Sequence, residues 1–393
     1  MFKVQRPRSL VVRGAGSCVA GAGVSRSGVL VSGVIACLAT AVIGAQTPIT
    51  VLEMKGTAAG TITLKVNAPG ATTISAFVDT MLAGNARPLT RDERGVWSGE
   101  IGPLAPDIYE AALIVGTSLR PIGTVTVPGT PPEVWEARKG PHGELHQLWY
   151  DSSAVKALRS VWVYTPPGYE KNTTQQYPIL YLLHGSGGAE GSWVDGGAAN
   201  VILDNLIASG KAQPMIVAMP FGHSEPSPRA GSTPTYTGRD ATAVTRDLLD
   251  EMMPLVESRF RVRRRSDSRA IAGLSMGGGQ ARTIGLSMPD LFRWVGTFSG
   301  SMPGLRGTPS LDAIESMLGA EFLADSFGTN ANIKLLWMSV GDDEAGMLTQ
   351  HKAMTDLLRN HGIRHTFVTY PGGHTWHVWR RSLRDFVPLL FQK

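Results

Sequence analysis

The spacing of hydrophobic and polar positions changes near residue 130 and divides the chain into two regions. Before that point, short segments alternate apolar and polar residues, as in Thr61–Val66, Ile74–Val78 and Tyr109–Val115. Turn sequences such as Ala68-Pro69-Gly70 separate them at short intervals. Short alternating strands with regular turns predict a small all-β sandwich over residues 46–127.

The second region, residues 134–393, carries continuous apolar runs in place of alternation, and a proline-rich linker at 128–133 separates it from the first. Strands that are buried on both faces of a parallel sheet have this composition. Segments with helical spacing lie between the runs, for example Val244 to Phe260. This alternation predicts a doubly wound α/β domain. The runs are Ser160–Tyr164, Ile179–Leu183, Met215–Met219, Ala270–Ala272 and Leu335–Val340.

Residues 1–45 have the pattern of an export signal. A basic start without any acidic residue leads into an apolar run from Val29 to Ile43 and then to Gly44-Ala45-Gln46. The run is shorter than the roughly 20 residues that a helix needs to span a bilayer, so we expect cleavage after Ala45 and not a membrane anchor. A lipoprotein-type cleavage at Cys37 is the lesser alternative, because the residues after it stay apolar. The protein is therefore expected to be secreted or periplasmic.

Cleavage of this leader (residues 1–45) changes what the charge and the cysteine content of the chain imply about its partners and its chemistry. The whole chain has 37 basic and 32 acidic residues, and five of the basic ones lie in the leader. The remaining chain is close to neutral, which argues against nucleic-acid or anionic-membrane partners. Both cysteines, Cys18 and Cys37, also lie in the leader. The exported protein is thus expected to have no disulfide, no thiolate metal site and no cysteine nucleophile.

The strongest chemical signal is Gly273-Leu274-Ser275-Met276-Gly277, a G-x-S-x-G motif. It directly follows an apolar run and precedes a stretch compatible with a helix, which is the strand–turn–helix setting of a nucleophile elbow. The flanking glycines fit a turn in which backbone segments approach too closely for Cβ atoms. We therefore predict that Ser275 is a nucleophile, which needs a general base because a serine hydroxyl reacts poorly at neutral pH.

The base and the acid should follow Ser275 in the chain. His374 lies in a turn just past the segment Thr366–Tyr370, where a sheet presents catalytic groups, and it is the predicted base. The acid is expected in Gly341-Asp342-Asp343-Glu344, directly after a predicted strand. From these residues alone Asp343 and Glu344 are equivalent candidates for orienting the imidazole.

A glycine-rich loop, His184-Gly185-Ser186-Gly187-Gly188, follows the predicted strand Ile179–Leu183. Backbone amides near Gly185 and Ser186, together with that of Met276, are predicted to form an oxyanion hole. The loop lacks the Lys-Ser/Thr of a P-loop and the spacing of a dinucleotide site, so a phosphate-binding role is disfavoured.

Together these motifs resemble the bacterial esterase D / feruloyl esterase family of α/β-hydrolases. The matching stretches are Tyr181–Gly188, Ala199–Ile207, Ile271–Gln280 and Gly372-Gly373-His374 with Trp379. The first region, with Gly95-Val96-Trp97 and Asp107-Ile108-Tyr109, resembles the early-set immunoglobulin-like domain, related to glycogen-binding modules, that precedes such esterases. Trp97 is either a sugar-stacking platform or a core residue, and we favour the core.

The resemblance adds expectations that the residues alone do not give. It implies Glu344 as the acid, no metal or organic cofactor, and a substrate pocket bordered by loops that hold Trp193, Asp195, Phe221 and His223. It also implies a hydroxycinnamoyl (feruloyl) or acetyl ester on plant cell-wall polysaccharide as the substrate. The alternatives are an esterase of siderophore or small aliphatic esters, an acyltransferase with a sugar acceptor, and a non-catalytic carbohydrate-binding protein that keeps the fold. Nothing in the sequence indicates an oligomeric state.

Overall fold

The computed structural model describes residues 48–81, 85–227, 241–305, 307 and 309–392. The predicted signal peptide lies outside these residues. Within them, no helix is both long enough and apolar enough to cross a bilayer.

The first region is all-β, as the alternating pattern predicts. Two four-stranded antiparallel sheets, ordered β1-β2-β6-β5 and β4-β3-β7-β8, enclose a core of alternate strand residues such as Ile62, Leu64 and Val66. Trp97 belongs to this core, because it is only 6% exposed and its indole N–H donates to the carbonyl oxygen of Ala68. The strands are β1 (Thr50–Thr57), β2 (Thr61–Asn67), β3 (Ile74–Val78), β4 (Arg87–Pro88), β5 (Thr90–Arg91), β6 (Val96–Ile101), β7 (Asp107–Val115) and β8 (Ser118–Val127).

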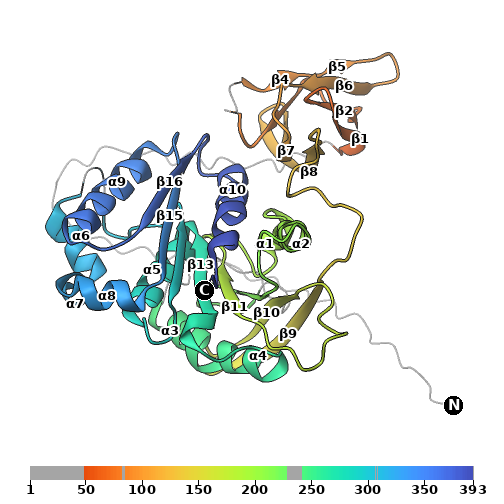
Figure 1. The fold of residues 1–393 in the computed structure, drawn as a ribbon. Helices are drawn as coiled ribbons and strands as arrows, with labels where there is room; N and C mark the ends of the chain where they lie inside the picture. The colour runs from red at the N-terminus through yellow and green to blue at the C-terminus, as the bar shows by residue number, and fades with distance from the viewer. Residues whose placement is uncertain (1–47, 82–84, 228–240, 306, 308, 393) are drawn as a thin grey trace, which may run out of the picture. The chain divides into compact units, whose positions relative to one another are not determined.

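An eight-stranded sheet forms the centre of the second region (Figure 1), in the order β16-β15-β14-β13-β11-β12-β10-β9. The six strands from β11 to β16 run parallel. At one edge of the sheet, β10 pairs antiparallel with β12, and β9 pairs antiparallel with β10. The strands are β9 (Glu144–Ser152), β10 (Ala157–Thr165), β11 (Ile179–Leu183), β12 (Ile216–Pro220), β13 (Arg269–Leu274), β14 (Trp294–Phe298), β15 (Leu335–Gly341) and β16 (Thr366–Tyr370). All the apolar runs that predict strands lie in this sheet.

Helices cover both faces of this sheet, which confirms the predicted α/β-hydrolase class of fold. Residues of α4, α5, α6 and α9 share one apolar core with the sheet, and residues of α1, α2 and α10 share the other. Strand β11 shows why its sequence is continuously apolar, since Ile179 and Tyr181 enter the first core while Leu180 and Leu182 enter the second. The helices are α1 (Ser192–Asp195), α2 (Ala199–Ala208), α3 (Ala241–Arg246), α4 (Met253–Arg259), α5 (Ser275–Ser287), α6 (Leu311–Leu318), α7 (Ala320–Ala324), α8 (Ser326–Asn332), α9 (Ala345–Asn360) and α10 (Trp376–Phe386).

The single helix expected near Val244–Phe260 is interrupted. A π-helical turn over Asp247–Met252 joins α3 to α4. His351 in α9 is completely buried, and its Nδ1 donates to the carbonyl oxygen of Met347 one turn earlier. Burial lowers the pKa of His351 to about 4, so the ring is neutral, and its proton lies on Nδ1 because the Met347 carbonyl can only accept.

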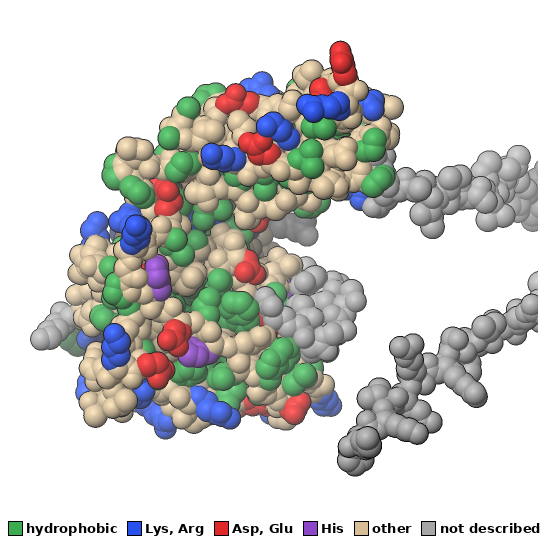
Figure 2. Space-filling model, turned by 90° about the vertical axis from the view of Figure 1, so that its right-hand side faces the viewer, with side chains coloured by type: hydrophobic (Ala, Val, Ile, Leu, Met, Phe, Trp, Pro, Cys, Tyr) green, Lys and Arg blue, Asp and Glu red, His purple; other side chains and the backbone are tan. Residues whose placement is uncertain are grey.

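Basic and acidic side chains alternate over the face of the molecule that Figure 2 shows, with apolar side chains between them. Because side chains of both signs are mixed on this face, they do not build an extended field of one sign there.

Candidate active site

Ser275 lies at a sharp turn between β13 and α5, near the middle of the large sheet. Its φ of 50° falls in the left-handed region, which non-glycine residues enter at a cost in energy. Two glycines make the turn possible. A Cβ on Gly273 would lie 2.6 Å from the carbonyl carbon of Gly277, and a Cβ on Gly277 would lie 2.4 Å from the carbonyl oxygen of His184. The turn therefore presents the partly exposed Ser275 beyond the carboxyl end of β13.

His374 lies in the turn between β16 and α10. Parallel strands end at the same edge of a sheet, so this turn reaches the end of β13 although β14 and β15 intervene. Nε2 of His374 is 2.9 Å from Oγ of Ser275, and Nδ1 is 2.6 Å from Oε2 of Glu344. The structure thus joins three of the residues singled out from the sequence in one chain of hydrogen bonds.

Glu344, and not Asp343, is the carboxylate that reaches His374. Glu344 is 8% exposed, and its Oε1 accepts from the Gly341 amide at 2.8 Å and from Oγ of Ser299 at 2.6 Å. Burial acts to raise the pKa of Glu344, but hydrogen bonds from His374, Ser299 and Gly341 outweigh it and lower the pKa. The side chain is therefore a carboxylate at neutral pH, suited to stabilise an imidazolium. Asp343 is exposed.

Ser299 holds this carboxylate and Trp379 holds Ser299; Ser299 is absent from the residues expected from the sequence, and Trp379 enters there only through the family resemblance. Ser299 follows β14 directly, and its hydroxyl, which donates to Glu344, accepts from the indole N–H of Trp379 at 3.2 Å. The indole ring of Trp379 also meets the ring of His374 edge-on, with centroids 4.9 Å apart. A polar residue directly after a buried parallel strand is the signal that could have drawn attention to Ser299, since such positions lie at the same edge as the nucleophile.

The loop His184–Gly188 packs against the nucleophile turn. A Cβ on Gly185 would lie 2.5 Å from the side chain of Leu274 and 3.3 Å from the Cβ of Ser275. Met276 is the second residue of α5, and the first N–H groups of a helix have no partner within it. The backbone of Gly185 and the amide of Met276 therefore both lie next to Ser275, while the side chain of Ser186 is exposed.

His184 fixes this loop. Burial lowers its pKa to about 3, so the ring is neutral, with Nδ1–H donating to the Gly185 carbonyl at 2.7 Å. Nε2 then accepts from the Gly222 amide at 2.8 Å, and the Gly222 carbonyl accepts from the side-chain amide of Gln280 at 3.0 Å. One neutral imidazole thus connects the loop after β11 to the loop after β12 and to α5.

Three of the four residues expected to border a substrate pocket are interior packing residues. Trp193, Phe221 and His223 are each 1% exposed. The Trp193 indole donates to the Leu183 carbonyl, and the ring of Phe221 packs with the rings of His184 and His223, which also contact each other. The resemblance locates their loops, but the rings turn inward and give a ligand no surface. Asp195, at the end of α1, is exposed.

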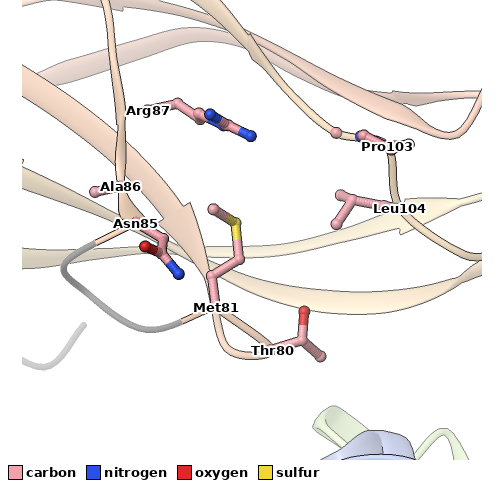
Figure 3. A pocket seen from close by; sticks show the side chains of 8 residues that line it. Thr80, Met81, Asn85, Ala86, Arg87, Pro103 and Leu104 are labelled. Atoms are coloured by element: carbon pink, nitrogen blue, oxygen red, sulfur yellow. The ribbon is translucent and has the colours of Figure 1, made fainter.

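The cavity drawn in Figure 3 belongs to the all-β region and not to the sheet that carries Ser275. It encloses about 600 Å³, and no aromatic side chain is among the described residues that line it. Its lining consists of Thr80, Met81, Asn85, Ala86, Arg87, Gly102, Pro103 and Leu104. Across the described ranges, no three His, Cys, Asp or Glu side chains gather as a metal site.

The arrangement at Ser275 supplies a nucleophile, a base in contact with it and a buried carboxylate behind the base. This is the set of groups that acyl transfer requires.

Comparison with known proteins agrees with this chemistry. Residues 152–390 match the family described as "Putative esterase". The chain is 31% identical over 347 residues to an endo-1,4-beta-xylanase/feruloyl esterase of Xylanibacter ruminicola, an alignment that covers 84% of this chain and 44% of that protein. The chain thus spans less than half the length of this relative.

Solved structures share the fold. A ferulic acid esterase superposes with a TM-score of 0.53 at 26% identity, covering 63% of this chain and 98% of its own. The enterobactin esterase of Shigella flexneri, crystallised in the presence of enterobactin, covers 87% of this chain and 95% of its own, with a TM-score of 0.62 at 14% identity. The second likeness shows the fold alone.

Proposed function

The chain belongs to the esterase family, and from this premise we propose that it is a carboxylesterase that releases hydroxycinnamoyl groups from plant cell-wall polysaccharide through an acyl-enzyme on Ser275. The observation that carries the proposal is the hydrogen-bonded chain from Ser275 through His374 to Glu344.

In the first half of the reaction, Oγ of Ser275 attacks the ester carbonyl while Nε2 of His374 takes its proton. The Glu344 carboxylate stabilises the imidazolium that forms. The imidazolium then gives the proton to the leaving sugar oxygen, and the acyl group stays on Ser275. In the second half, His374 takes a proton from water as the water oxygen attacks the acyl carbonyl. The bond to Oγ of Ser275 then breaks, the imidazolium returns the proton to Oγ, and the carboxylic acid leaves.

Negative charge develops on the carbonyl oxygen in both halves. We assign its stabilisation to the amide of Met276 and to amides of the Gly185–Ser186 loop, since the close packing of Gly185 against Ser275 supports this position. The neutral His184, which holds the loop in place, would then position the donors without adding a charge of its own.

The choice of acyl group rests on the relatives. The xylanase/feruloyl esterase and the ferulic acid esterase both act on feruloyl esters by name. Such esters occur on polymers outside the cell, and this agrees with the predicted signal peptide, so we propose secretion or export to the periplasm as well.

We also propose that the all-β region is an immunoglobulin-like domain. The domain limits 46–127 and 134–393 stay predictions.

A panel of esters tests the proposal. Purified protein is assayed on methyl ferulate, acetyl-xylan and p-nitrophenyl acetate, with Ser275→Ala as the matched inactive variant. We expect hydrolysis of methyl ferulate to have the highest kcat/KM, and Ser275→Ala to lower kcat by about 10⁴–10⁶. A higher kcat/KM on acetyl-xylan or on p-nitrophenyl acetate would show that the acyl group is acetyl and not hydroxycinnamoyl. An unchanged rate in Ser275→Ala would refute the acyl-enzyme.

A further inference from the structure

Helix α10 connects the candidate active site to the all-β region. It begins two residues after His374 and carries three basic side chains, His377, Arg380 and Arg381, in its first two turns. All three reach the same residue, Asp107, which is the first residue of β7 in the all-β region.

Asp107 is completely buried, and its two carboxylate oxygens are shared among these partners. Oδ1 accepts from Nε of Arg380 at 2.9 Å, while Oδ2 accepts from Nη1 of Arg381 at 2.5 Å and lies 2.9 Å from Nδ1 of His377. A buried carboxylate is stable only when it is paired and hydrogen-bonded, and removing it leaves the buried partner charges uncompensated. Asp107 therefore constrains α10 strongly.

Arg380 extends the constraint to a third segment. It is 1% exposed, and besides Asp107 it donates to the carbonyl oxygens of Ile108 at 2.5 Å and Gly196 at 2.6 Å. Gly196 follows α1 and packs so closely on Trp376 that a Cβ there would lie 2.3 Å from the indole nitrogen. One guanidinium thus joins β7, the segment after α1 and the first turns of α10.

The other face of α10 supports the catalytic groups. Trp379 donates to Ser299, which donates to Glu344, and the same indole lies edge-on against His374. A displacement of α10 would therefore move the histidine and loosen the carboxylate at once. Misplacement by about 1 Å at a reacting group can cost up to 10²-fold in rate.

The aromatic residues of the all-β region do not form a surface on which sugars could stack. Residues 46–127 contain three aromatic residues, Phe77, Trp97 and Tyr109. Trp97 and Tyr109 are buried and Phe77 is half-buried, and the ring of Tyr109 lies against His377, with centroids 4.6 Å apart. Exposed aromatic rings, which bind sugars by stacking, are thus absent from the described part of this region.

We propose that the all-β region is a brace for the hydrolytic site and that Asp107 is its positioning residue, acting through α10 on His374 and Glu344. The proposal rests on the carboxylesterase activity and not on the identity of the acyl group.

The test compares Asp107→Asn with the wild type in the full chain, on p-nitrophenyl acetate. We expect kcat to fall about tenfold while KM changes less than about twofold, because the variant disturbs the reacting groups and not the ester contacts. Hydrogen–deuterium exchange, which needs no substrate, should accelerate at the amides of 375–382 and stay unchanged in α5. Glu53→Gln is the matched control, since Glu53 forms an exposed ion pair with Lys65 in the same region.

Wild-type kcat in folded Asp107→Asn, a loss confined to KM, or equal effects of Asp107→Asn and Glu53→Gln would each overturn the proposal. Arg381→Gln decides the matter if Asp107→Asn does not fold, because Arg381 is partly exposed and its loss removes one partner only. Arg381→Gln should lower kcat by a smaller factor than is expected for Asp107→Asn and should accelerate hydrogen–deuterium exchange at the same amides. An unchanged kcat in Arg381→Gln would overturn the proposal. Activity on the aryl acetate without activity on methyl ferulate would overturn the proposed acyl group and leave this test intact.

Discussion

The carboxylate of Glu344 is held on both oxygens, one by His374 and the other by Ser299 and the Gly341 amide. This double attachment fixes the plane of the carboxylate and thereby the tautomer of the imidazole, in which Nδ1 carries the proton and Nε2 faces Ser275. The neighbouring Asp342 serves another purpose, because its Oδ1 accepts from the Gly372 amide and ties the acid loop to the histidine loop. Two acidic residues of one turn thus have separate tasks. Asp342 positions the backbone of the histidine loop, and Glu344 contacts the catalytic base.

Glu344 contacts the base and its exposed neighbour Asp343 does not, so substitutions at these two positions should have different effects. Glu344→Gln should lower kcat by about 10³–10⁴, because an amide cannot stabilise the imidazolium and can favour the wrong tautomer. Asp343→Asn, the matched control at an exposed position, should stay within about twofold of the wild type, as surface changes usually do. Initial rates on p-nitrophenyl acetate measure both, and a larger loss in Asp343→Asn would reverse the assignment of the acid.

At the scale of elements, the nucleophile turn depends on close approach between α5 and the loop after β11. Gly277 lies in the first turn of α5 and faces the carbonyl oxygens of Leu183 and His184. The same approach brings Gly185 against Ser275, so one packing contact shapes both the nucleophile and the loop that we assign to the oxyanion hole. Glycine is required here by space and not by backbone conformation.

Gly277→Ala should therefore destabilise the protein by about 1–3 kcal/mol, the usual cost of overpacking, and should reduce kcat as the loop shifts. Gly346→Ala is the control, because Gly346 lies in the first turn of α9 with no atom within 4 Å of an added Cβ. That substitution should raise the free energy of unfolding by up to about 1 kcal/mol. Urea unfolding of both variants tests the contrast, and equal effects would show that crowding is not the reason for the glycine.

On the scale of the whole molecule, the contact between β7 and α10 should depend on pH. Burial acts to raise the pKa of Asp107, but His377, Arg380 and Arg381 outweigh it and lower the pKa. Burial acts to lower the pKa of His377, but Asp107 and Asp79 outweigh it and raise the pKa above 6.5. Asp107 therefore stabilises the folded protein at pH values above 3.8, the pKa of the group in the unfolded chain. This stabilisation is lost as the pH falls through the lower pKa that Asp107 has in the folded protein. The contribution of His377 is present below 6.5 and is lost as the pH rises through its raised folded value.

The difference in free energy of unfolding between the wild type and Asp107→Asn should accordingly be greatest between about pH 4 and 6.5 and should shrink on either side. Urea unfolding across this range measures it. His377→Gln, which keeps an N–H but cannot titrate, should remove the decline on the alkaline side only. A difference that does not vary with pH would mean that Asp107 acts through its shape and not its charge.

Local patterns in the sequence specify much of this protein. The fold class follows from continuous apolar runs alternating with helical spacing, because burial on both faces of a sheet imposes that pattern wherever it occurs. Ser275 and His374 could be singled out because strand–turn–helix and strand–turn settings involve only neighbouring residues.

Only the tertiary structure decided which side chains meet. It brings Glu344 to His374, where the residues by themselves leave Asp343 an equal candidate and only the family resemblance implies Glu344. It also adds Ser299 and Trp379 behind them, and turns Trp193, Phe221 and His223 inward. It also pairs Asp107 with Arg380, 273 positions later in the chain. Adjacent acids are interchangeable in a linear pattern, and the partners of a buried charge are set by how distant elements pack, which no periodicity along the chain records.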